Sequence, residues 1–96
     1  MTLVEFLTAR LDEDYDYAQR YADLDGGDYD RLVRDVEAKR AILEVYAEVV
    51  AEIRGAAFDD ERLGSMRGTR AGLEAAIYAL ATVYSDHSSH NEAWRP

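Results

Sequence analysis

Carboxylates and tyrosines are interleaved in the first third of the chain, and no other stretch is as distinctive in its chemistry. Residues 11–30 hold eight acidic residues and one basic residue, Arg20, so this stretch carries a charge of −7. A cluster of like charges attracts a surface of the opposite sign, and tyrosine is enriched among the side chains that anchor protein interfaces. The candidate protein-binding residues are Asp12, Glu13, Asp14, Tyr15, Asp16, Tyr17 and Tyr21.

Three interpretations of this acidic stretch are consistent with the sequence. The first is a non-enzymatic protein that acts by binding a basic protein partner. The second is an acidic DNA mimic, which inhibits a host nucleic-acid-binding or defence protein by occupying its nucleic-acid groove. The third is a dimeric structural bundle without a dedicated partner, in which the acidic stretch is only a solvated helix face.

Two groups of metal-ligand types occur in the chain. Residues 23–28 have the acidic and glycine residues of a calcium-binding EF-hand loop. That loop needs Gly at position six and Glu at position twelve, where this chain has Asp28 and Arg34. His87 and His90 are ligand types that zinc prefers, but no third ligand follows at a recognisable spacing. We therefore expect no metal ion and no other cofactor.

The composition excludes several classes of protein. A net charge of −9, from 20 acidic and 11 basic residues, argues against direct binding to nucleic acid or to an anionic membrane. The absence of cysteine excludes a disulfide scaffold and a cysteine nucleophile. The first residues lack the segments of a signal peptide, and no uncharged run approaches the ~20 residues of a membrane span. We expect a cytoplasmic protein.

Apolar residues recur at helical spacing in three segments, so the sequence predicts an all-α fold. The expected helices span residues 3–23, 29–54 and 70–84, with an irregular segment over 55–68 and a tail over 85–96. A capping box between Thr2 and Glu5 is expected to begin the first helix. Residues 1–96 then form a single helical domain, a small bundle with a long antiparallel helix hairpin and a shorter third helix.

The second predicted helix has the clearest periodicity and the widest apolar face. Its seam follows heptad spacing from Tyr29 to Ile53, and a second apolar row runs beside it. This face is wider than two neighbouring helices would cover, which favours a homodimer.

Lys39, the only lysine, lies in the middle of this seam. It could act as a base or nucleophile or fix the register of helix pairing. The interpretation we favour is that its stem packs while its ammonium group reaches Asp35 or an acidic residue of a partner helix. The chain has no phosphate-binding glycine loop, no nucleophile elbow and no HExxH motif. We therefore expect a protein that is not an enzyme.

Segments at both ends and in the middle of the chain resemble one family. These segments are FLTARLDED over 6–14, RLVRDVEAKRAIL over 31–43, YSDH over 84–87 and WRP over 94–96. They are similar to a family of small actinobacterial and actinophage proteins of unknown function, with a central VLxEVEAKRxIL helix and a YADHPDYxxxWRP ending. The resemblance implies an actinobacterial or phage source and no particular activity. The chain departs from the family in lacking cysteines before its last helix.

The recurrence of the terminal tryptophan in the resembled family implies that the tail docks on the helices. The residues expected to take part are Tyr84, Asp86, His87, Trp94 and Arg95. We expect Trp94 to pack on the helix pair with Tyr84 beside it, and Arg95 to reach an acidic residue of the first helix. Asp86 or His87 would bond the loop backbone. The alternative is an exposed peptide that another protein binds.

Overall fold

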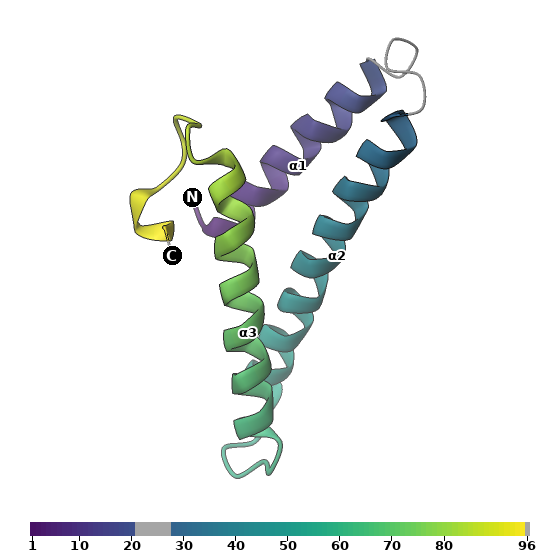
Figure 1. Ribbon diagram of the computed structural model, residues 1–96. Helices are drawn as coiled ribbons and strands as arrows, with labels where there is room; N and C mark the ends of the chain where they lie inside the picture. Colours follow the sequence, from purple (N-terminus) through teal and green to yellow (C-terminus); the bar gives the residue numbers. More distant parts are fainter. Residues whose placement is uncertain (21–27, 96) are drawn as a thin grey trace.

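The computed structural model describes residues 1–20 and 28–95, which form three α-helices and two short 3₁₀ turns (Figure 1). The helices are α1 (Leu3–Arg20), α2 (Asp28–Gly55) and α3 (Leu63–Ala81), and the turns are η1 (Thr82–Tyr84) and η2 (Glu92–Trp94). The described residues contain no strand. The prediction of an all-α fold is confirmed.

α2 is the longest helix, and the other two helices pack against different halves of it (Figure 1). α1 runs antiparallel along the first half of α2, and α3 runs antiparallel along the second half. α1 and α3 approach each other only where the start of α1 meets the end of α3. The molecule is therefore elongated, with dimensions of 55 × 27 × 18 Å.

The hydrophobic core lies where the three helices and the C-terminal tail meet. Its buried residues are Phe6, Leu7, Leu11, Val36, Leu43, Ile77, Ala81 and Trp94. Leu7, Leu11 and the buried Ala18 follow one another at helical spacing along α1. The core is thus built from one stripe of α1, the middle of α2, the end of α3 and one residue of the tail.

The first helix begins with the predicted capping box. The backbone N–H of Thr2 donates to Glu5 Oε1 at 3.0 Å, and the backbone N–H of Glu5 donates to Thr2 Oγ1 at 3.1 Å. The hydrogen bond from the Thr2 backbone lowers the pKa of the exposed Glu5 carboxyl. These bonds satisfy backbone groups that an uncapped helix would leave without partners.

The third helix begins earlier than the glycines of this region indicate. We expected irregular chain over 55–68 and a helix from 70, but α3 begins at Leu63. Just before the helix, Asp60 closes the loop, because its Oδ1 accepts the backbone N–H of Arg62 at 2.8 Å. Gly64 and Gly68 then lie within the helix, where Leu63 is half-buried.

None of the helices in the described ranges has both the length and the apolar character needed to cross a lipid bilayer.

Candidate functional site

Three of the four acidic candidate residues have partners within the molecule. Asp12 forms an ion pair with Arg40 of α2 at 2.7 Å, and Glu13 forms one with Arg10 at 2.8 Å. Asp14 accepts a hydrogen bond of 2.5 Å from the Tyr84 hydroxyl. Three of the four acidic candidates on α1 therefore help to hold α1 against its neighbours or to orient its own arginine.

The tyrosines of the same stretch have different environments. Tyr15 packs against the core, and the Arg40 guanidinium lies 5.4 Å from its ring centroid. Tyr17 is 56% exposed, and the neighbouring Asp16 is exposed as well. Tyr21, the last candidate, lies outside the described residues, as does most of the EF-hand-like segment.

A groove opens beside Tyr17, between the end of α1 and the start of α2. Its volume is about 740 Å³, and its lining residues are Tyr17, Asp28, Arg31, Leu32, Arg34 and Asp35. Two smaller hollows of about 210 and 280 Å³ adjoin it, and Tyr17 lines both of them. The exposed tyrosine therefore lines all three hollows at this end of the molecule.

The only lysine adopts the structural role that its position predicts. The Lys39 Nζ lies 2.8 Å from an Asp35 carboxylate oxygen one turn earlier on α2. Its side chain is largely buried, and its partner Asp35 lines the groove. An ammonium group committed to a carboxylate in this way has no free lone pair for nucleophilic chemistry.

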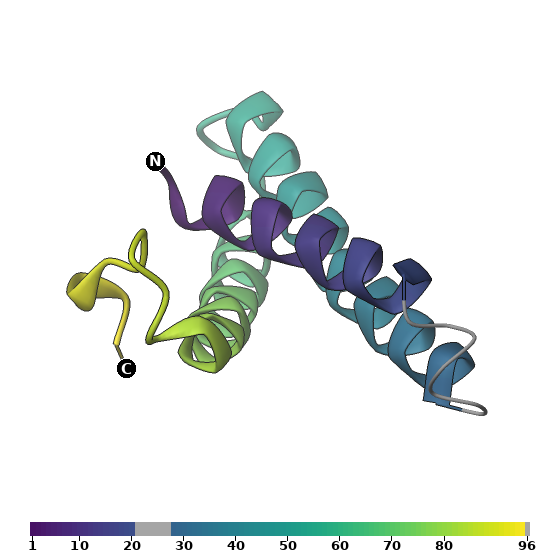
Figure 2. The same ribbon diagram turned by 90° about the horizontal axis from the view of Figure 1, so that it is seen from above.

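The tail folds back from the end of α3 toward the start of α1 (Figure 2). Trp94 is 9% exposed, and its ring centroid lies 5.0 Å from that of Phe6. The rings of His87 and His90 meet Phe6 edge to face at 5.7 and 5.8 Å. Phe6 is thus enclosed by aromatic side chains from the tail, a geometry that adds to simple burial.

Arg10 is the polar centre of this tail contact and was absent from the predicted site. It is 8% exposed, and its guanidinium lies 5.1 Å from the Phe6 ring centroid. Arg10 Nη1 lies 2.9 Å from His87 Nδ1 and 2.7 Å from His87 Nε2. The signal for it is an arginine on the apolar face of the first helix, three and four residues after Leu7 and Phe6.

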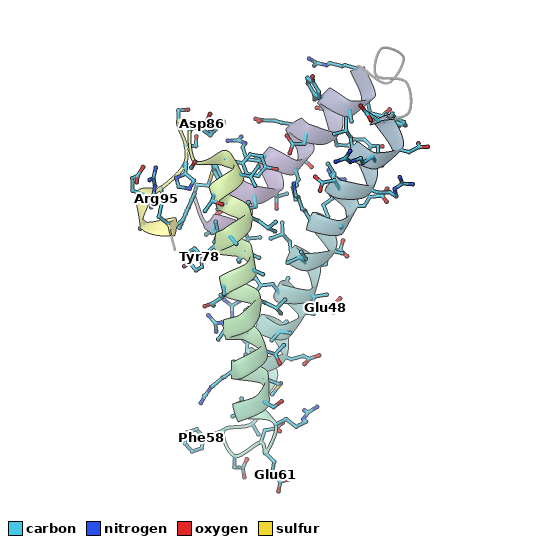
Figure 3. All side chains as sticks on the ribbon, in the orientation of Figure 1. Glu48, Phe58, Glu61, Tyr78, Asp86 and Arg95 are labelled. Atoms are coloured by element: carbon cyan, nitrogen blue, oxygen red, sulfur yellow. The ribbon has the colours of Figure 1, made fainter. Side chains whose placement is uncertain are left out.

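One expectation about the tail is wrong. Arg95 does not reach α1, because its guanidinium pairs with Glu92 one turn earlier at 2.8 Å. Tyr84 packs on Phe6, with ring centroids 6.3 Å apart, and its hydroxyl is bound to Asp14. The expectation that Asp86 or His87 bonds the loop backbone is confirmed for His87, because the backbone N–H of Ser89 donates to its Nδ1 at 3.0 Å. Asp86 is exposed, as Figure 3 shows.

Two tyrosine hydroxyls with raised pKa values tie the helices together. Burial, with the hydrogen bond to Asp14, raises the pKa of Tyr84 far above its ordinary value. Burial and the bond to Glu74 also raise the pKa of Tyr46, whose hydroxyl donates to Glu74 Oε1 at 3.0 Å. The hydrogen bond from Arg70, and then that from Tyr46, lowers the pKa of Glu74.

The described residues contain no group of three or more histidine or acidic side chains that could hold a metal ion. His87 contacts Arg10 and the Ser89 backbone, while both ring nitrogens of His90 are buried without a hydrogen-bond partner among those residues. The two histidines therefore face Phe6 and Trp94 and share no ligand position.

Residues 24–96 match a family of unknown function (DUF6221). The chain belongs to this family. Neither the curated proteins nor the solved structures give a match. The part that matches DUF6221 includes α2, α3 and the docked tail, whereas Phe6 and Arg10, on which the tail docks, precede it.

Proposed function

We propose that this DUF6221 protein is not an enzyme and that it acts by binding a protein with a basic surface. The observation that supports this most directly is the exposed Tyr17 beside the groove between α1 and α2. A tyrosine ring in a partly apolar recess is a common anchor of protein interfaces, because it supplies a large contact area at low entropic cost.

The carboxylates of the hollow beside the groove set the chemistry of the partner, since the groove itself is lined by two aspartates and two arginines. Glu13 and Asp16 flank Tyr17 in one of the adjoining hollows. Glu13 keeps its side chain 60% exposed although it pairs with Arg10. These carboxylates can accept further hydrogen bonds from a partner, and exposed lysine or arginine side chains are the complementary donors.

The positions of the residues with shifted pKa values support the non-enzymatic part of the proposal. Residues with strongly shifted pKa values mark catalytic clefts in many enzymes. Here Tyr46, Glu74 and Tyr84, whose pKa values are shifted, bind α2 to α3 or α3 to α1 and do not line the groove. Their shifts are accounted for by helix packing.

The internal ion pairs weigh against the DNA-mimic alternative. A DNA mimic needs carboxylates spaced like phosphates and free of neighbouring positive charge. Asp12 and Glu13 instead lie in contact with Arg40 and Arg10, so the negative potential of this face is lower than the residue count indicates.

Photo-crosslinking tests the proposal. A photoreactive phenylalanine replaces Tyr17 in one sample and the exposed Glu48 on the second half of α2 in another (Figure 3). The lysate comes from an actinobacterium, the source that the terminal motifs indicate. We expect an adduct from position 17 that is absent from position 48 and that weakens as salt rises to about 0.5 M.

Two charge variants complete the test. Asp16→Lys should abolish the position-17 adduct. Glu48→Lys makes an equal change of charge on the second half of α2, away from the groove, and should leave the adduct intact. Identical adducts from both positions, or an adduct that survives Asp16→Lys, would contradict the proposal. A captured protein that releases DNA when this chain is added would favour the DNA-mimic alternative instead.

A further inference from the structure

The two histidines of the chain both lie in the tail, and both rings meet the ring of Phe6. His90 also meets the Trp94 indole edge to face, with ring centroids 5.5 Å apart. Both ring nitrogens of His90 are buried, and neither has a hydrogen-bond partner in the part of the chain that the structure describes. A buried polar atom without a partner is costly. A phenylalanine would fill this space without that cost, so packing alone does not account for a histidine here.

His87 is contacted by hydrogen-bond donors. Its Nδ1 accepts the backbone N–H of Ser89 at 3.0 Å, and Arg10 Nη1 lies 2.9 Å from Nδ1 and 2.7 Å from Nε2. A neutral imidazole has one acceptor nitrogen, whereas a protonated imidazole has none. Protonation of His87 would therefore remove the acceptor that these donors share, and it would place a positive charge beside the Arg10 guanidinium.

The charged and titratable side chains around the two rings come from α1, η1 and the tail itself. Six of them are joined in pairs, Arg10 with Glu13, Tyr84 with Asp14 and Arg95 with Glu92, and the seventh, Asp86, is exposed (Figure 3). Within residues 1–20 and 28–95, no carboxylate forms an ion pair with either histidine. The charge that directly contacts the rings is thus the positive charge of Arg10.

We infer that the tail is a latch that opens in mild acid, because protonation of His87 and His90 releases Trp94 from Phe6. Released histidines stand in water, where an imidazole binds a proton below pH ~6.5. The docked tail disfavours that proton at both rings, so it binds fewer protons than the released tail. Docking is therefore complete above this pH and is lost as the pH falls below it.

Release of the tail uncovers Phe6, which is completely buried while Trp94 is docked. The latch is a property of the start of α1, where Phe6 and Arg10 lie. The groove beside Tyr17 lies toward the other end of α1. The inference therefore stands apart from the proposed function, and either one can fail without the other.

Tryptophan fluorescence reports the latch directly, since Trp94 is the only tryptophan of the chain. Between about pH 7.5 and about pH 5, the equilibrium constant for docking should fall about thirtyfold for each histidine. The emission of Trp94 should shift to longer wavelength, and acrylamide should quench it more strongly, because the indole enters water. Far-ultraviolet circular dichroism should change little, because the three helices remain folded.

Two substitutions assign the effect to the histidines. His90→Phe fills the same space without a titratable nitrogen, and His87→Gln keeps an acceptor for Arg10. The double variant should keep Trp94 shielded at both pH values, and each single variant should retain about a thirtyfold fall. Asp86→Asn, at the exposed neighbour of His87, is the matched control and should release Trp94 as the unaltered chain does.

Three results would overturn the inference. The first is equal shielding of Trp94 at both pH values in the unaltered chain. The second is acid release in the double variant that is as large as in the unaltered chain, which would assign the release to carboxylates. The third is a loss of helical circular dichroism in step with exposure of Trp94, because the whole fold and not the tail would then be sensitive to acid. If the double variant is already undocked at the higher pH, His90→Phe alone decides: a fall as large as that of the unaltered chain contradicts the latch.

Discussion

The two ends of the molecule are built differently. At the junction, where the start of α1, the middle of α2, the end of α3 and the tail meet, Phe6, Leu7, Leu11 and Ile77 are almost completely buried. In the arm, which comprises residues 44–76 of α2, its loop and α3, no side chain is fully buried. Both regions are helical, so secondary structure alone does not produce a core.

The number of packed layers explains the difference. Two helices in contact each cover only one stripe of the other, so residues such as Tyr46 and Ile53 in the arm remain half-buried. The junction adds a third helix and then Trp94, whose ring centroid lies 5.0 Å from that of Phe6. A chain of 96 residues has little apolar surface to bury, and here it is concentrated at one end. We expect the stability of the molecule to be concentrated there as well.

The largest expected effect comes from truncating the centre of the junction. Phe6→Ala should lower the free energy of unfolding by about 3–5 kcal/mol, because it removes a completely buried ring and leaves a cavity. Ile53→Ala in the arm should cost about 1–2 kcal/mol, since part of that side chain is already in contact with water. Urea denaturation followed by circular dichroism measures both values. Equal losses would show that the arm is as well packed as the junction.

Removing the tail residue should have the next largest effect. Trp94→Ala should lower the free energy of unfolding by about 2–3 kcal/mol, which is less than Phe6→Ala because the freed tail can move and does not leave a closed cavity. Arg95→Ala is the matched control. It removes only an exposed pair with Glu92 and should cost less than about 1 kcal/mol. If both variants melt like the unaltered chain, the tail contributes nothing to the junction.

The junction and the arm also differ in how well the sequence predicts them. Thr2 and Glu5 identify the start of α1, because a capping box is a local pattern with a local cause. The ion pair between Asp35 and Lys39 follows from their spacing in the same way. In the arm, glycines at 64 and 68 indicated irregular chain, yet packing of α3 on α2 keeps them helical. Helix propensity is overridden there by tertiary contacts.

The contacts of the candidate site are harder to predict because they are long-range. Acidic residues of α1 are easily recognised in the sequence, but only the fold brings Arg40 to Asp12 and Tyr84 to Asp14. Exposure of Tyr17 and burial of Tyr15 depend on which side of α1 meets α2. The periodicity of α1 shows which residues share a side of the helix, but only the position of α2 decides which side is buried. Whether this surface binds a partner stays a prediction.

Alkaline pH should distinguish the tyrosine of the junction from the tyrosine of the arm. The raised pKa of Tyr84 means that the folded state retains a proton that the unfolded state loses. Its stabilising effect is complete below pH ~10, the ordinary tyrosine value, and is lost as pH rises above it. In thermal melts from pH 8 to 11, the melting temperature should fall more steeply with pH for the unaltered chain than for Tyr84→Phe.

The arm tyrosine supplies the comparison for that experiment. Tyr46→Phe should change the fall of melting temperature with pH less than Tyr84→Phe does. Tyr46 is less buried than Tyr84, and Glu74 Oε1 accepts hydrogen bonds from both Tyr46 and Arg70. At pH 7 the loss of the Asp14 bond in Tyr84→Phe should cost about 1–2 kcal/mol. If Tyr46→Phe reduced the alkaline loss of thermal stability more than Tyr84→Phe did, the stronger helix contact would lie in the arm.

The smallest expected effect lies at Glu74, which joins α2 to α3 within the arm. Its lowered pKa means that its contribution is present above the ordinary glutamate value of 4.5 and is lost as pH falls through that value toward the folded pKa. Because the pair with Arg70 is only half-buried and is screened by solvent, Glu74→Gln should cost only a few tenths of a kcal/mol at pH 7. Melts at pH 7 and pH 3 measure it: the difference between the variant and the unaltered chain should vanish at the lower pH. A loss above about 1 kcal/mol at pH 7 would mean that the arm depends on this network as the junction depends on Phe6.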